Sequence, residues 1–455
     1  MRGQSARHGG DDAARSSRVR SWRAPSAGRG PAAAVMFAAV VSATTITSLA
    51  GVTPADADPT SRVIACGQTI TTSVKLATDL RNCPGDGLVI GASGITVDLN
   101  GHTISGRNIL GSEGIADDGH GDVVIRNGVI RDFFVDGVGL RNARGSVVHD
   151  LAIRQIGAGG VNGQFSAGIA LADSPTSRID DNTVTNNVAA FEADGIVVKR
   201  SPGVRLVDNR LNQNSWDGLF VFASPHGRVE DNTADANPNN GMEVNGASDS
   251  TQILGNEATR NGNVGIAAGA MQHARIVGNT ANANGFGTQA DHAGLFLFDL
   301  NTSEIRENTA DRNVVGIDLF GGLHGSTRNR IVGNTANRNA TIGLLIDTGG
   351  DGTVANSAHG NIVIGNIANR NQGPIAVRGG GIDVFGTGNQ LRANVADNNV
   401  ADGVLIGTPG NALTDNTANR NAGHGIDGRV GTLDGGDNRA HDNRLPPQCV
   451  GVSCA

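Results

Sequence analysis

The stretches Asn279-Thr-Ala-Asn-Ala-Asn284 and Gly294-Leu-Phe-Leu-Phe298 decide the fold of this chain. The first carries two asparagines spaced five apart, and such pairs occur eleven times from Asn182 to Asn443, at intervals of 22 to 32 residues. A small apolar residue, usually alanine, occupies the middle of each pair. A motif that recurs at this interval is typical of stacked structural repeats, in which each repeat contacts only its neighbours.

Each asparagine pair is followed by a glycine and a short alternating run, such as Gly218-Leu-Phe-Val-Phe222 or Gly316-Ile-Asp-Leu-Phe320. Positions one and three after the glycine are aliphatic, and this period of two predicts a strand with one buried face. A second aliphatic site, such as Leu206 or Ile276, precedes the next asparagine pair. Stacking such repeats about 4.8 Å apart joins the aliphatic side chains into one core and lets the asparagines bond in ladders.

These patterns predict an all-β fold, a right-handed single-stranded parallel β-helix of about 13 coils. Leucine-rich repeats have a similar period but need a leucine-dominated frame, which the chain lacks. Calcium β-rolls need tandem glycine-rich nonapeptides, and Gly349-Gly-Asp-Gly352 is an isolated fragment. An aromatic content of 3% argues against helical bundles.

The two ends of the chain differ from the repeats. Residues 1–57 contain seven arginines and no lysine, then an apolar stretch and the small-residue site Ala55-Asp-Ala57, which predict a secretory signal peptide. The alternative is a membrane anchor, which is disfavoured because serines and threonines interrupt the apolar stretch. We expect no stable membrane insertion once the signal peptide is removed. The expected domains are an N-terminal cap with a disulfide (58–93), the β-helix (94–445) and a C-terminal disulfide tail (446–455).

The four cysteines, Cys66, Cys83, Cys449 and Cys454, lie near the two ends of the predicted stack. Only the local pairs Cys66–Cys83 and Cys449–Cys454 can bond within one molecule, because the ends lie too far apart. Two disulfides predict an extracellular, secreted protein, and no metal site is expected at the thiols. Without residues 1–57 the chain has 29 basic and 40 acidic residues (36 − 7 and 43 − 3), a net charge of −11, which predicts no nucleic-acid partner held by bulk electrostatics.

One segment points to a known family. Gly94-Ile-Thr-Val-Asp-Leu-Asn-Gly-His-Thr-Ile-Ser-Gly106, continued by Val123-Val-Ile-Arg-Asn-Gly-Val-Ile130, resembles the first coils of secreted bacterial proteins with parallel β-helix repeats. These belong to the pectate-lyase-like group of carbohydrate-binding proteins and sugar hydrolases, and the resemblance covers roughly residues 64–445. It implies a polysaccharide partner without choosing a reaction. Signature motifs of the enzymes are mostly absent: Gly423-His424-Gly425 has the letters of a polygalacturonase motif without its companions.

The outward positions of the glycine-led strands form a stripe rich in phenylalanine and acids. Aromatic rings cover the apolar faces of sugars and acids accept their hydroxyl groups, so these positions are predicted to bind substrate. The predicted substrate-binding residues are Phe220, Phe222, Glu243, Phe296, Phe298, Phe320 and Phe385. The alternative is that these rings pack beneath loops or in a dimer contact.

Candidate catalytic residues lie on the same stripe. Asp318, Asp347 and Asp383 fall on successive coils with a two-residue offset, which predicts roughly 8 Å between neighbouring carboxylates, as in an inverting glycoside hydrolase. Solvated surface acids are the alternative. A lyase would use Lys199, Arg200 or His292 as base, with calcium on nearby acids as an optional cofactor.

The predicted function is a secreted protein that binds, and in one version cleaves, an extracellular polysaccharide by lyase or hydrolase chemistry. The alternative is a non-catalytic glycan-binding or surface-adhesive rod. Metal delivery is a third hypothesis, disfavoured by four methionines and scattered histidines. The sequence leaves the oligomeric state open.

Overall fold

The computed structural model describes residues 61–157, 165–188, 192–287, 292–348, 358–373, 380–429 and 431–455, which form strands and turns and contain no helix. The chain divides into two units, Met1–Ala57 and Asp58–Ala455. All described residues belong to the second unit, and the predicted signal peptide, residues 1–57, lies outside them.

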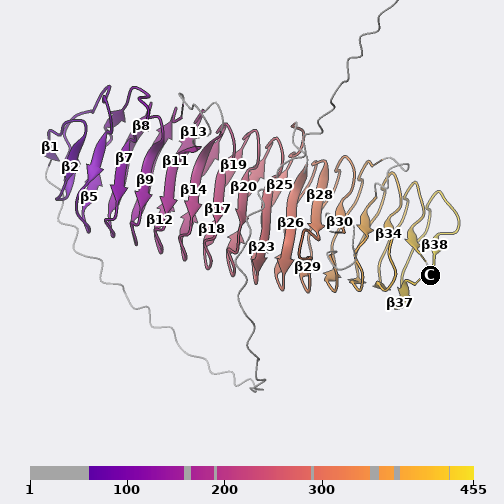
Figure 1. Ribbon diagram of the computed structural model, residues 1–455. Helices are drawn as coiled ribbons and strands as arrows, with labels where there is room; N and C mark the ends of the chain where they lie inside the picture. Colours follow the sequence, from indigo (N-terminus) through magenta and orange to yellow (C-terminus); the bar gives the residue numbers. More distant parts are fainter. Residues whose placement is uncertain are drawn as a thin grey trace, which may run out of the picture. The chain divides into compact units, whose positions relative to one another are not determined.

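The second unit consists of two long parallel sheets, and the strands of each follow one another along a single stack (Figure 1). Sheet A contains β1 (Ser61–Arg62), β3 (Val74–Leu76), β5 (Thr96–Asp98), β6 (Thr103–Ser105), β8 (Val124–Arg131), β10 (Val147–Arg154), β12 (Arg178–Asp180), β13 (Thr183–Thr185), β15 (Arg205–Val207), β16 (Arg210–Asn212), β18 (Arg228–Glu230), β19 (Thr233–Asp235), β21 (Gln252–Leu254), β22 (Glu257–Thr259), β24 (Arg275–Val277), β25 (Thr280–Asn282), β27 (Glu304–Arg306), β29 (Arg330–Val332), β31 (Ile362–Ile364), β33 (Gln390–Arg392), β35 (Ala412–Thr414) and β37 (Leu433–Asp434). Sheet B contains β2 (Gln68–Ile70), β4 (Leu88–Ile90), β7 (Ile115–Asp118), β9 (Asp136–Arg141), β11 (Phe165–Ala172), β14 (Glu192–Lys199), β17 (Leu219–Phe222), β20 (Met242–Asn245), β23 (Ile266–Gln272), β26 (Ala293–Asn301), β28 (Val315–Phe320), β30 (Leu344–Ile346), β32 (Ile382–Val384), β34 (Val404–Ile406), β36 (Ile426–Gly428) and β38 (Cys449–Val450).

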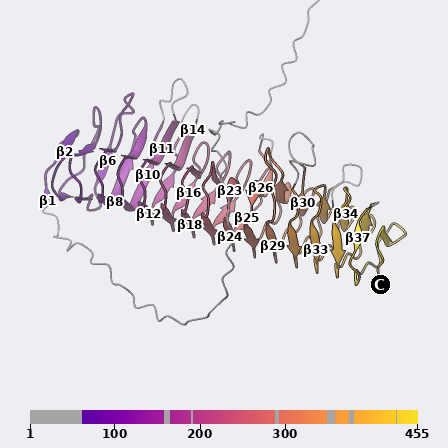
Figure 2. The same cartoon turned by 60° about the horizontal axis from the view of Figure 1, so that its bottom comes forward.

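One coil passes once through sheet B and, in the middle of the stack, through two short strands of sheet A. Thus β14 is followed by β15 and β16, and then by β17, which pairs with β14 one coil earlier. Figure 2 shows sheet A strands such as β12, β18, β24, β29 and β33 in sequence along the stack. The 16 strands of sheet B exceed the expected count of about 13 coils, because pairing begins at β2 and continues to β38.

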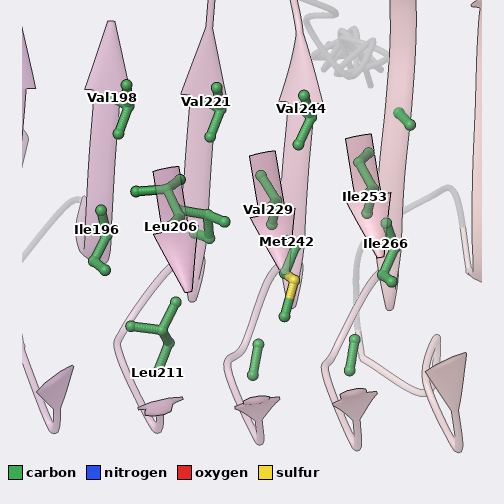
Figure 3. Packing of buried hydrophobic residues seen from close by; sticks show 14 of the residues in the cluster. Ile196, Val198, Leu206, Leu211, Val221, Val229, Met242, Val244, Ile253 and Ile266 are labelled. Carbon is green, nitrogen blue, oxygen red and sulfur yellow. The ribbon is translucent and has the colours of Figure 1, made fainter. Parts of the chain in front are cut away.

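The core lies between the two sheets and is built from aligned aliphatic side chains. Ile196 is in register with Leu219, and Val198 with Val221, as the period of two predicts. Figure 3 shows Ile196, Val198 and Val221 packed with side chains of sheet A, such as Leu206, inside the coils. All five are fully buried, so the predicted inward positions are confirmed.

Both asparagines of each pair form ladders along the stack. In the first, each side-chain amide from Asn182 to Asn416 donates to the Oδ1 of its equivalent in the next coil, at 2.9–3.1 Å. The second ladder runs from Asn187 to Asn443 in the same way, except that the step from Asn313 to Asn339 is bonded through the backbone N–H of Asn313. These hydrogen bonds satisfy the buried polar groups at the turns, which would otherwise lie unpaired against the core.

A third ladder was not predicted from the sequence. It lies at the turn after the sheet B strand and runs through Asn329, Asn361, Asn389 and Asn411 at 3.0–3.1 Å. Earlier coils use serine at this turn, and the backbone N–H of Ser201 donates to the Ser224 hydroxyl at 3.0 Å. In these coils the turn after the sheet B strand is therefore also held by side chains.

Replacing Asn279 by alanine is expected to lower the free energy of unfolding by about 1–3 kcal/mol. Its Oδ1 accepts the backbone N–H of Asn256, and its amide donates to Asn308 Oδ1 and the Ile253 carbonyl, each at 2.9 Å. The side chain is 1% exposed, so these partners would lose their bonds without access to water. Chemical denaturation measures the loss of stability. Thr280→Ala is the control, because Thr280 is a half-buried neighbour on β25. Equal stability of the two variants would contradict the structural role of the ladder.

Two disulfides close the ends of the stack. Cys66 bonds Cys83 and Cys449 bonds Cys454, with Cα–Cα distances of 5.4 and 6.1 Å. No described cysteine is free. Both predicted pairs are confirmed.

Candidate functional site

The outer face of sheet B carries the predicted stripe. Phe220 is in register with Glu243, Phe296 with Asp318, and Phe298 with Phe320. The predicted substrate-binding residues Phe220, Phe222, Glu243, Phe296, Phe298, Phe320 and Phe385 are all partly exposed. The structure therefore places this set on one surface, as the alternation of the strands predicts.

The phenylalanines form two ring clusters on this face. Phe220 and Phe222 lie with ring centroids 6.3 Å apart and planes 12° apart. Phe296 stacks on Phe298 at 5.4 Å and on Phe320 at 5.8 Å. Three coil steps, or about 14 Å, separate β17 from β26. Each cluster presents a partly exposed aromatic surface in line with the other.

Polar groups lie on the coils around the first cluster. The Lys199 ammonium lies 5.9 Å from the centroid of the Phe220 ring, a cation–π distance. On the next coil, Glu243 accepts hydrogen bonds from the side-chain amides of Asn240, at 2.9 Å, and Asn245. The Glu243 carboxylate is thus fixed beside an aromatic surface.

A second row of carboxyls borders this face, and sequence reasoning missed it. Asp136, Asp194 and Asp217 each immediately precede the glycine of the glycine-led run on sheet B, and we call them the carboxyl row. Asp194 Oδ1 accepts the backbone N–H of Asp217 at 3.0 Å, and Asp217 Oδ1 accepts that of Asn240 at 2.8 Å. Each carboxyl therefore links its coil to the next one.

The first carboxyl of the row belongs to a small ion-pair network. Asp136 Oδ1 accepts the Ala167 N–H at 3.1 Å, and its Oδ2 lies 3.4 Å from the Arg141 guanidinium. Arg141 also pairs through two nitrogens with Glu113, one coil earlier. The bidentate geometry orients both side chains.

Burial raises the pKa of all three carboxyls. It raises the pKa of Asp136 to about 8, assisted by the charge of Glu113 and opposed by Arg141. It raises the pKa of Asp194 to about 7, opposed by the hydrogen bond from Asp217 N–H. Burial and the Asp194 charge hold the pKa of Asp217 well above its usual range. Carboxyls with pKa values near neutrality are able to exchange protons at physiological pH.

The predicted catalytic residues occupy different surroundings. Asp318 is 9% exposed and Asp383 fully buried, whereas Lys199, His292 and Asp347 are partly exposed. Asp318 and Asp383 lie two coils apart, on β28 and β32, and the strand between them, β30, ends at the residue before Asp347. Whether any of them acts on a substrate stays a prediction.

A shallow depression of about 450 Å³ brings two predicted residues together. Asp347 and Phe385 line it, with Ile342, Leu345, Thr348, Gly407 and Thr408. Burial raises the pKa of Asp347, opposed by hydrogen bonds from Thr348. This depression lies on the sheet B side of the later coils and combines an acid with an aromatic ring.

Both histidines named from the sequence make a hydrogen bond to a neighbouring coil, His292 through its backbone and His424 through its ring. The His292 backbone N–H donates to Asn263 Oδ1 at 3.2 Å. His424, of the Gly-His-Gly stretch, has Nδ1 2.8 Å from the Pro447 carbonyl oxygen. Within the described coils, no group of three or more His, Cys, Asp or Glu residues is arranged to hold a metal ion. Calcium therefore stays a prediction.

In the part of the chain that the structure describes, no helix is long and apolar enough to cross a membrane. The two parallel sheets, whose successive coils are linked by asparagine ladders, define a parallel β-helix protein. The chain belongs to the family described as the right handed beta helix region, whose model matches residues 93–258 and 247–336, more than half of the chain. No curated protein sequence matches it.

Solved structures resemble the chain at low identity. The A-module of mannuronan C-5 epimerase AlgE6 from Azotobacter vinelandii is 14% identical, with 88% of this chain and 91% of that one covered and a TM-score of 0.39. DFA-IIIase from Arthrobacter chlorophenolicus A6 without its lid is 13% identical, with coverage of 80% and 88% and a TM-score of 0.42. The GH87 alpha-1,3-glucanase from Streptomyces thermodiastaticus strain HF3-3 is 14% identical, with coverage of 84% and 63% and a TM-score of 0.39. At these scores no catalytic residue is transferred to this chain.

Proposed function

We propose that the protein is secreted and binds an extracellular polysaccharide along the outer face of sheet B. The observation that carries this proposal is the pair of ring clusters, Phe220/Phe222 and Phe296/Phe298/Phe320, partly exposed and in line along the stack. Exposed rings are costly in water unless a partner covers them, and sugar rings present apolar faces of matching shape.

The geometry of the stack suits a linear polymer. Coils follow one another about every 4.8 Å, so a glycan lying along the stack crosses one strand after another and meets both clusters. Glu243, held by two asparagine amides beside the first cluster, accepts hydroxyl hydrogens. The two disulfides support a location outside the reducing cytoplasm.

Cleavage of the bound polymer is the second candidate function. The carboxyl row favours this function. Asp194 lies on β14, the strand that carries Lys199, and Asp217 lies on the coil of β17, the strand that carries Phe220. A protonated carboxyl donates a proton to a glycosidic oxygen, and a neighbouring ionised carboxyl activates water or stabilises positive charge at the sugar. Asp194→Asn would then abolish turnover while leaving binding in place.

The double variant Phe220→Ala/Phe222→Ala is expected to weaken polysaccharide binding at least tenfold, because it removes the first aromatic surface. Retention of the protein on immobilised neutral and acidic polysaccharides is measured together with reducing ends and unsaturated-product absorbance. Leu433→Ala, an exposed apolar residue on sheet A, is the control for general loss of apolar surface. Equal retention of both variants on every polysaccharide that holds the unaltered protein would refute the proposed surface.

A further inference from the structure

A second surface, separate from the outer face of sheet B, carries a row of exposed arginines. Arg312, Arg338 and Arg370 each immediately precede the second asparagine of a pair, and we call them the arginine row. The backbone N–H of each arginine donates to a carbonyl oxygen in the next coil, that of the residue just before the equivalent corner. The bonds run from Arg312 to Asn337 at 3.1 Å, from Arg338 to Asn369 at 3.0 Å and from Arg370 to Asp397 at 3.1 Å. The three residues therefore stack on consecutive coils.

The arginine row lacks the acidic partners that other arginines of the chain have. All three side chains are exposed, and none forms an ion pair within 4.0 Å with a described residue. At the same corner of other coils, Arg260 pairs with Asp235 at 2.5 Å and Arg420 with Asp397 at 3.9 Å. Three like charges thus stand one coil apart without an ion-pair partner within 4.0 Å among the described residues.

The fold does not require arginine at this corner. The corner residue has a positive φ of 57–59° in the arginine row, and Gln213, Ala236, Ala283 and Asn398 adopt φ of 56–60° there in other coils. Asparagine suits this conformation better than arginine does. Neighbouring like charges also repel, so the arginines oppose stability and point instead to a ligand.

We propose that the arginine row binds a linear acidic polysaccharide that carries one carboxylate or sulfate on each sugar unit. The coil repeat of about 4.8 Å is close to the length of one sugar in an extended chain, so successive guanidinium groups meet successive anionic groups. Guanidinium binds carboxylate and sulfate through two parallel hydrogen bonds. The whole chain has a net charge of −7, so the attraction is local to this row.

A straight row also suits a glycan better than a nucleic acid. The phosphates of duplex DNA follow a helical path, and a straight line of three cations meets few of them. The row lies at the corner before the sheet B strands, so its ligand is bound independently of the ring clusters. Loss of binding at the arginine row is therefore expected to leave binding at the ring clusters unchanged.

The test is the triple variant R312Q/R338Q/R370Q on immobilised polygalacturonate, eluted with a salt gradient. We expect it to elute at lower salt than the unaltered protein, with a Kd at least tenfold higher at low ionic strength. The control R178Q/R228Q/R275Q removes the same charge from arginines that pair with Asp180, Glu230 and Glu304. It is expected to change the Kd less than about threefold.

Three results would overturn the proposal: no retention of the unaltered protein, equal loss in both triple variants, or tighter row-dependent binding of a single-stranded oligothymidylate. The variant F220A/F222A separates the two surfaces, because it is expected to keep the salt-dependent retention that the triple variant loses. Circular dichroism of each variant shows that the coils remain folded.

Discussion

The free energy of unfolding is expected to fall by several kcal/mol as the pH rises from about 4 to about 8. The cause is the carboxyl row, in which burial raises the pKa of Asp136 to about 8 and that of Asp194 to about 7. An aspartate in the unfolded chain has a pKa of about 3.9, so the folded protein holds more protons between these values. The stability is fully present below pH 4 and is lost as the pH rises through about 7 to 8.

Denaturant unfolding at several pH values measures this dependence. One pKa unit corresponds to about 1.4 kcal/mol, so two buried carboxyls give an effect of several kcal/mol. Asp194→Asn mimics the protonated side chain and keeps the acceptor for the Asp217 N–H, so it is expected to stabilise the protein at pH 8 and to be near neutral at pH 4. Asp208→Asn, on an exposed turn, is the matched control. A stability that rises between pH 4 and 8 would contradict the protonated state of the row.

The same protons connect stability with the second candidate function. A carboxyl that stays protonated near neutral pH is a proton donor, and one that ionises beside it is a base. The hydrogen bonds from Asp217 N–H and Asn240 N–H fix the carboxyls of Asp194, within β14, and of Asp217, two residues before β17. If the protein cleaves its polymer, the activity should decline over the pH range in which its stability falls.

The core and the corner ladders were predictable from the sequence because they repeat with a fixed chemical requirement. Positions one and three after the glycine must be apolar in every coil, and Leu219 and Val221 show the pattern as clearly as Ile196 and Val198. The third ladder was missed because the residue at its position changes from serine to asparagine along the stack, as from Ser303 to Asn329.

The carboxyl row was missed for a related reason. Asp-Gly is a common turn dipeptide, so Asp194-Gly195 and Asp217-Gly218 give no sign in the sequence that their carboxyls are buried. Only the structure shows that the carboxyls are buried and bond the next coil. Exposure was also unpredictable, because alternation gives the direction of Asp383 but not what lies above it, and that side chain is fully buried.

Replacing Gly218 by alanine is expected to cost about 3 kcal/mol, although one methyl group is the only change. Its Cβ would lie 2.6 Å from the Gly241 carbonyl oxygen and 2.9 Å from Asn237 Nδ2. The Gly241 oxygen accepts the Leu219 N–H at 3.1 Å, and the Asn237 amide donates to Asn261 in the second ladder. Relief of the clash therefore disturbs both the pairing of sheet B and the ladder.

Gly85→Ala is the matched control, because no atom lies within 4 Å of the added Cβ. Thermal unfolding of the two variants is compared with that of the unaltered protein, and Gly85→Ala is expected to change the Tm little. Glycine precedes the sheet B strand in coil after coil because neighbouring backbones approach there without room for a side chain. An unchanged Tm for Gly218→Ala would mean that the coils are spaced more loosely than these distances imply, and the asparagine ladders would then lose their geometric basis.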